Sequence, residues 1–255
     1  MKKTMMIGLA LGVVAITATS AFAVITGSKH DLSVAQQGVT PGADAQDRIC
    51  IYCHHPHNTV KAADIQGTFQ YSPLWNRDVP ASSRFSIYNN SAGSTNMMGD
   101  TSSSKHMMNG TPAVGGVSLL CMSCHDGVTA LNAYSDNNTF VGAGSTAIAT
   151  GSTQTGTMAT NTITGVASFG NDLSNHHPIG MVWSEVLGNG TTTGDDEIAA
   201  TSATFANTSI TIGSVLTGGV MECSSCHDVH NGTSAERFLW TTNNSSAFCL
   251  SCHLK

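Results

Sequence analysis

The chain has 255 residues, a formal net charge of −6 and only 10% charged residues, against about 25% in ordinary globular proteins. This acidic balance argues against a nucleic-acid partner, which would require a basic surface. A surface so poor in charge repels copies of itself weakly, so it permits close self-association.

The first 23 residues are typical of a secretory signal peptide. Lys2 and Lys3 precede an apolar stretch from residue 5 to residue 16, and Ala21-Phe22-Ala23 forms a small-x-small cleavage site. The apolar stretch is too short for a membrane span, which needs about 20 residues, and no second run of that length follows. We therefore expect an exported protein without a transmembrane segment, whose mature part, residues 24–255, is a single domain.

All eight cysteines fall into four Cys-x-x-Cys pairs, and a histidine follows each pair at once. The four motifs are CIYCH (residues 50–54), CMSCH (121–125), CSSCH (223–227) and CLSCH (249–253). Eight cysteines in an exported chain would first suggest four disulfides, but this spacing is the attachment signature of c-type haem.

The chemistry of haem attachment requires this spacing. Two cysteines three apart lie on one side of a helical turn, where their sulfurs can form thioethers with both vinyl groups of a porphyrin, and the adjacent histidine reaches the iron. A thioredoxin-like redox pair does not need the histidine, and zinc sites do not place one after each second cysteine. We predict four covalent haems c, attached through Cys50, Cys53, Cys121, Cys124, Cys223, Cys226, Cys249 and Cys252, with His54, His125, His227 and His253 as proximal iron ligands.

The second axial ligand separates electron carriers from haem enzymes, because an open position on the iron admits substrate. His57 and His230 each follow a proximal histidine by three residues, so each can reach a neighbouring haem but not its own. His177 precedes Pro178, which favours an extended backbone, and His30 lies near the mature N-terminus. These four histidines are the predicted distal ligands, which would make every iron bis-histidine.

Three other histidines are weaker candidates. His176 adjoins His177, so we expect only one of the two to be used, and His55 sits beside a proximal ligand and points elsewhere. His106 is held in reserve. Methionine could replace histidine and raise the reduction potential, but four nearby methionines are interpreted as packing side chains: Met97, Met98, Met107 and Met108.

The composition predicts a multihaem cytochrome c fold that is mostly coil, with short helices at the haem motifs and a few short strands. Residues 135–220 are rich in Gly, Ser and Thr and fit either a flexible linker or a packed surface layer; the alternation at residues 209–212 hints at a strand. Four porphyrins leave too little chain for a conventional core, so the haems should form it. Aromatic side chains are expected against them: Phe69, Trp75, Phe85, Trp183, Phe238 and Trp240.

The succession SKHDLS, CIYCHHPHN, SPLWNR, NHHPIG and CSSCHDVHNG, ending in CLSCH, resembles the doubled-CXXCH multihaem cytochromes. It is most similar to the tetrahaem extracellular cytochrome nanowires of metal-reducing bacteria, the OmcE type, over the N-terminal third and the C-terminal haem pair. The resemblance implies a subunit that polymerises into a filament of stacked bis-histidine haems. It also implies that one distal ligand crosses the subunit interface, a role that falls to His57, with His30 as the other candidate.

Three functions compete. The first is an extracellular electron conductor, not an enzyme, that joins head to tail into a homopolymer and exchanges electrons with other redox proteins or extracellular acceptors. The fourth haem supports this contact, because it has almost no chain after it and must take its ligand from upstream or from another molecule. The second is a discrete periplasmic tetrahaem shuttle, although a shuttle usually shows a charged docking face. The third, a haem enzyme such as an oxyanion reductase, requires one open iron.

Overall fold

A computed structural model describes residues 25–32, 49–56, 73–77, 79–87, 113–129, 131, 163, 165–187, 198–231 and 237–254. The predictions on the signal peptide, on His57, His106 and Phe69, and on the four methionines at residues 97, 98, 107 and 108 lie outside these ranges. No helix in the described ranges is long and apolar enough to cross a membrane.

The described chain is mostly irregular, with short helices and two-residue strands, which confirms the predicted fold class. In chain order the elements are η2 (Ile49–Tyr52), η4 (Ser82–Arg84), β1 (Ser86–Ile87), α1 (Gly116–His125), η5 (Gly165–Ala167), β2 (Asp172–Leu173), β3 (Met181–Val182), α3 (Trp183–Val186), α4 (Ile212–Val215), β4 (Val220–Met221), α5 (Cys223–Cys226), η6 (Asn244–Ser246) and α6 (Ala247–Cys252), where η denotes a 3-10 helix.

Each haem motif contains a helical turn: α1 ends at its histidine, α5 and α6 end at their second cysteine, and η2 ends at Tyr52, one residue before Cys53. The turns are η2, α1, α5 and α6. In three of them the histidine backbone N–H closes the turn onto the carbonyl of the first cysteine: His54 onto Cys50 (2.8 Å), His227 onto Cys223 (3.1 Å) and His253 onto Cys249 (2.9 Å). The turn therefore brings the two sulfurs to one side, as the spacing predicts.

Distant segments brace these turns through the backbone. The carbonyl of the second cysteine accepts an N–H from a residue far away in the chain in three motifs: Cys53 from Asn76 (2.9 Å), Cys226 from Trp240 (3.2 Å) and Cys252 from Ala199 (2.8 Å). In the remaining motif, the N–H of Phe169 donates to the carbonyl of His125 (2.9 Å). Each haem motif is thus held from two sides, by its own turn and by a segment remote in the chain.

Two apolar clusters support the turns. The first surrounds α1 and the parallel pair β1–β2, and contains Phe85, Leu119 and Met122. The second surrounds the antiparallel pair β3–β4, in which Met181 lies opposite Met221, and the side chains of Cys226 and Cys252 pack against it. The second cluster therefore touches two haem motifs at once.

The described parts of the Gly/Ser/Thr-rich middle segment are packed. Residues 165–187 and 198–220 contain β2, β3, α3, α4 and β4, and they supply most of the second cluster. The hint of a strand at residues 209–212 is wrong beyond a single bridge between Thr204 and Thr211. The Thr211 side chain instead accepts the backbone N–H of Ser214 (3.3 Å) and caps α4, which starts the helix at Ile212.

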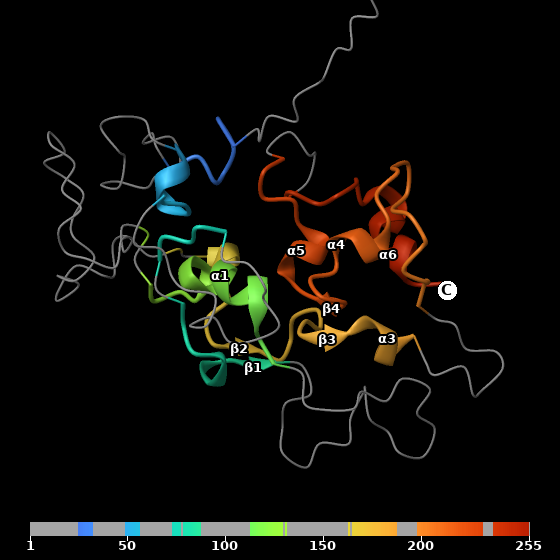
Figure 1. Cartoon of the computed structure of the whole chain (residues 1–255), viewed down its shortest axis with the longest axis horizontal. Coiled ribbons are helices and arrows are strands. Elements are labelled where there is room, and N and C mark those ends of the chain that lie inside the picture. Colours follow the sequence, from blue (N-terminus) through green and yellow to red (C-terminus); the bar gives the residue numbers. More distant parts are fainter. Residues whose placement is uncertain are drawn as a thin grey trace, which may run out of the picture.

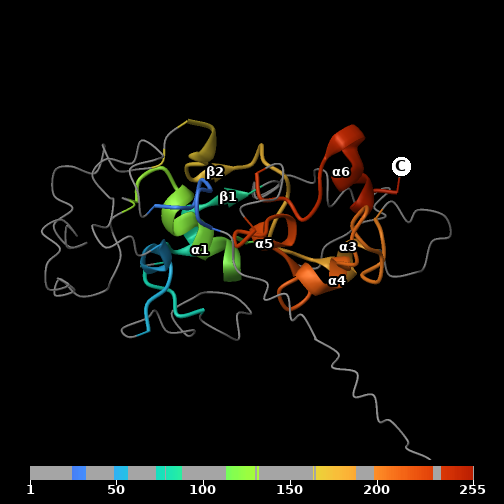
Figure 2. The same ribbon diagram turned by 90° about the horizontal axis from the view of Figure 1, so that it is seen from above.

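The four haem-motif turns follow one another along the molecule. Figure 1 shows the light-blue turn at residue 50, then α1, α5 and finally α6 along the longest axis, and Figure 2 shows the same order from above. The first and last motifs therefore lie at opposite ends of the described part of the chain.

Candidate haem sites

Three proximal histidines have the protonation that iron binding needs. The ring Nδ1 lies next to a backbone carbonyl oxygen in each: His54 at 2.5 Å from Pro73, His125 at 2.7 Å from Ala167, and His227 at 2.8 Å from Arg237. A carbonyl can only accept, so Nδ1 must carry the proton and donate. Nε2 then keeps its lone pair for a metal, and the hydrogen bond also fixes the orientation of the ring.

Three pairs of imidazole rings lie at the separation that one iron would span. The ring centres are 6.0 Å apart for His54 and His230, 6.1 Å for His30 and His125, and 6.3 Å for His177 and His253. Metal–nitrogen bonds of about 2 Å on each side, extended to the ring centres, give roughly 6 Å. Each pair joins one predicted proximal histidine to one predicted distal histidine.

The pairs also show which motif each distal histidine reaches. His230 follows the third motif, yet its ring faces His54 of the first motif. His177 faces His253, so the last motif finds its partner upstream in the same chain. His227 has no such ring partner within the described ranges. The same ranges contain no group of three or more His, Cys, Asp or Glu side chains that could hold a metal ion.

Burial favours the neutral form of His30, His54 and His125. Burial lowers the pKa of His30 to about 4, and the nearby charges of His125 and His227 lower it further. Burial also lowers the pKa of His54 and of His125. Neutral imidazole is the form that binds metals, so these three rings are in the form that can bind iron at neutral pH. The ring of Phe238 stacks on His30 at 4.5 Å and holds it over the second motif.

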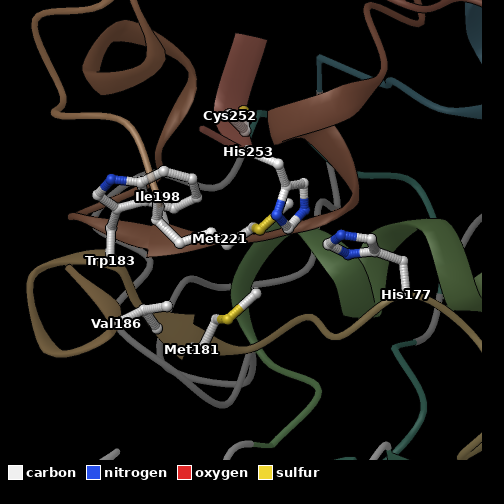
Figure 3. Close-up of a pocket in the computed structure, with 8 residues that line it drawn as sticks. All are labelled: His177, Met181, Trp183, Val186, Ile198, Met221, Cys252 and His253. Carbon is white, nitrogen blue, oxygen red and sulfur yellow. The ribbon is translucent and has the colours of Figure 1, made fainter. Parts of the chain in front are cut away.

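An apolar pocket lies beside the fourth motif. His177 and His253 face each other at its rim, and Met181, Trp183 and Met221 form its wall (Figure 3). The indole Nε1–H of Trp183 donates to the carbonyl of Ala199 (3.2 Å), so the ring presents only carbon toward the pocket. Such a wall suits the apolar face of a porphyrin.

Another observation fits a haem at the first motif. The indole Nε1 of Trp75 is buried without a hydrogen-bond partner in the described ranges, and its ring lies 5.8 Å from that of His54. Buried donors almost always have a partner. A propionate of a haem bound at His54 would be a suitable acceptor, so the residues present fit the group.

The cysteines of neighbouring motifs lie next to each other, and none of the eight forms a disulfide. Burial raises the pKa of Cys53 to about 12, and the charge of Cys124 adds to this. A hydrogen bond to Cys223 and burial raise the pKa of Cys121. Burial raises the pKa of Cys226 to about 12, with a further contribution from Cys252. A hydrogen bond thus links the second motif to the third, and the thiols of the first and second motifs, and of the third and fourth, lie close enough for their charges to interact.

The other histidine candidates lie elsewhere. The ring of His176 contacts Phe169 at 5.2 Å, so His177 is the member of that pair that faces a proximal histidine. His55 is buried, and its backbone N–H donates to Leu74 (2.9 Å). Sequence reasoning missed the buried Glu222 and Arg77. The position of Glu222 directly before CSSCH was the available signal.

Residues 215–255, which contain the third and fourth motifs, match the family described as "Doubled CXXCH motif". The match supports a multihaem c-type cytochrome. Its CXXCH motifs imply covalent binding of haem c, and with it a role in electron transfer. None of the curated proteins compared with the chain matches it.

Proposed function

We propose that this multihaem cytochrome carries four haems c, all bis-histidine, and transfers electrons rather than transforming a substrate. The observation that carries the proposal is the set of three imidazole pairs, each with ring centres 6.0 to 6.3 Å apart. An iron between two imidazoles has no free position for a substrate. The proximal ligands are His54, His125, His227 and His253, and the distal ligands are His30, His57, His177 and His230.

The order of the motifs supports a conductor. The cysteine thiols of consecutive motifs lie within electrostatic range of one another from the first motif to the fourth, and the two end motifs lie at opposite ends of the described part (Figure 1). Chains joined head to tail would continue the row, and such a contact, when it does not close, generates a filament. We therefore propose an exported protein that polymerises into an extracellular conductive filament, like the nanowires that its motifs resemble.

Within this filament, we assign the distal ligand that crosses between chains to His57. His30 already faces His125 in its own chain, and the last motif already has His177. Among the four predicted proximal histidines, His227 is the one without a distal ring opposite it within the described ranges. His57 of one chain would bind the iron at His227 of its neighbour, so that this iron would gain its second axial ligand only when the chains assemble.

The deciding experiment is cryo-electron microscopy of the protein sheared from its native cells, combined with His57→Ala and His30→Ala variants of the recombinant holoprotein. We expect wild-type filaments with only low-spin haem. His57→Ala should give discrete particles with one high-spin haem, whereas His30→Ala should lose one low-spin haem and still polymerise.

Other outcomes would replace parts of the proposal. Compact wild-type particles with only low-spin haem would establish the periplasmic shuttle. Filaments that persist in His57→Ala, with one high-spin haem, would place this ligand inside the chain. A high-spin haem in the wild type would favour an enzyme.

A further inference from the structure

Glu222 lies at the contact between the second and third haem motifs. It directly precedes α5, which carries the third motif, and its side chain reaches α1, which carries the second. Only 4% of its surface is exposed. A carboxylate in such a position is rare unless a partner compensates its charge.

The carboxylate holds α1 and α5 together. Both the backbone N–H and the hydroxyl of Ser118 donate to its Oε2, the former at 3.2 Å. The same hydroxyl accepts the backbone N–H of Cys223 (3.0 Å), so one serine links the carboxylate to the third motif. On the other side, Gly116 leaves room: a Cβ there would lie 3.1 Å from Oε1 of Glu222.

Within the described ranges, no cation compensates the charge of Glu222. The groups that face it from α1 are Ser118 and Cys121, and from its own side Cys223 and Ser225. No lysine, arginine or histidine lies in ion-pair range of it within the described ranges. The thiols of Cys121 and Cys223 lie close enough to Glu222 for its charge to act on them. Both thiols would become thioethers when haem is attached.

We propose that Glu222 is a redox-linked proton acceptor, which binds a proton when the haems of the second and third motifs are reduced. The proposal rests on the proposed function, because it requires haems at Cys121 and Cys223. It assigns to Glu222 a role beyond holding two helices: it would couple electron flow through the middle of the row to the pH of the surroundings.

The charge balance is simple. With haems bound at these motifs, an external one-electron donor such as dithionite would reduce one ferric haem to ferrous, and the environment of the carboxylate would lose one positive charge. Glu222 then takes one proton from water, and its carboxylate becomes a carboxylic acid; reoxidation reverses both changes. Its protonation equilibrium is already suited to this, because burial raises the pKa of Glu222 to about 7, although two hydrogen bonds from Ser118 lower it. Loss of nearby positive charge raises that pKa further.

The sign of the effect follows. The reduced protein binds the proton more tightly than the oxidised one, so the midpoint potential of the coupled haems falls as pH rises between the two pKa values. A tenfold change in proton concentration is worth at most about 59 mV for one proton and one electron. We expect a smaller slope at each haem, because two haems share one proton.

The test compares spectroelectrochemical titrations of the wild-type holoprotein, Glu222→Gln and Asp172→Asn from about pH 5 to pH 9. Asp172 is a matched control, since its carboxylate is fully exposed. Glu222→Gln should flatten the pH dependence of the two central haems, and Asp172→Asn should keep it. Redox-difference infrared spectra should show a carboxylic-acid C=O band that appears on reduction and is absent only in Glu222→Gln.

A second variant keeps the test decisive if Glu222→Gln folds poorly. Ser118→Ala removes the hydroxyl hydrogen bond that lowers the pKa of Glu222 and keeps the one from the backbone N–H, so the pH-dependent window should move to higher pH. An unchanged slope and infrared band in Glu222→Gln, or an unchanged pH-dependent window in Ser118→Ala, would overturn the proposal. Failure of the proposed function would look different, because a chain without haems at these two motifs would lack their redox transitions altogether.

Discussion

The imidazole rings of His54 and His230 lie 6.0 Å apart, although the two histidines belong to the first and third haem motifs. His230→Ala should therefore convert the haem at His54 to high spin and leave the haem of its own motif low-spin. Roughly one quarter of the haem should change, since one of four irons loses a ligand. Electron paramagnetic resonance and visible spectra of the holoprotein measure this. His176→Ala, which changes a ring that contacts only Phe169 among the described rings, should stay fully low-spin.

Phe238 stacks on His30 and orients it. Phe238→Ala should weaken the hold on His30 by about 0.5 to 1.5 kcal/mol, the usual value of an aromatic contact. The low-spin spectrum of the haem at His125 should then be lost at a lower temperature than in the wild type. Phe248→Ala removes a comparable stack, on Phe205, and is the control. An equal spectral change in both variants would show general destabilisation instead.

Gly180 permits a close backbone approach beside the fourth motif. A Cβ at this position would lie 2.1 Å from the carbonyl oxygen of Ala113, and φ is +77°. Gly180→Ala should lower the free energy of unfolding by more than about 2 kcal/mol, as strain and clash add. Gly170→Ala has φ of +68° but meets no atom within 4 Å, so it should cost only about 1 kcal/mol. Denaturant unfolding of the two holoproteins gives the comparison; equal costs would mean that the Ala113 contact relaxes freely.

Arg77 is almost fully buried and supports the second motif. Its guanidinium donates to the carbonyls of Ser123 (3.2 and 3.3 Å) and Leu131 (2.7 Å). Arg77→Met should cost about 3 kcal/mol of unfolding free energy, because two buried carbonyls lose their donor.

The control for Arg77 is Arg84, which is 45% exposed in its side chain and lies 3.6 Å from Asp126. Arg84→Met should cost less than about 1 kcal/mol, because the Arg84 side chain lies largely in solvent and the buried carboxylate of Asp126 keeps its hydrogen bonds from Val128 and Thr129. Chemical denaturation measures both variants. Similar losses would show that the Arg77 hydrogen bonds contribute no more than the half-exposed Arg84 side chain does.

The local part of each site could be predicted from the sequence. The turn between Cys223 and Cys226 and the position of His227 depend on a few consecutive residues, and the structure shows the expected geometry. Residues 209–212 do not form the strand that their alternation suggested, because the side chain of Thr211 caps α4 and starts a helix at Ile212.

The partners of the proximal histidines could not be predicted in this way. The spacing excluded the haem of its own motif as the partner of His230. Only the packing of remote segments places His230 opposite His54. The same holds for Glu222, whose position before CSSCH says nothing about Ser118 on α1.

The sequence by itself determined the chemistry of attachment: eight cysteines and four adjacent histidines, because a thioether-bound haem needs its two sulfurs and its proximal ligand within one helical turn. The tertiary structure decided which distal ring faces which proximal ring, and which motifs lie side by side. These relations depend on apolar clusters and backbone contacts between residues far apart in the chain, and no local pattern encodes such distances.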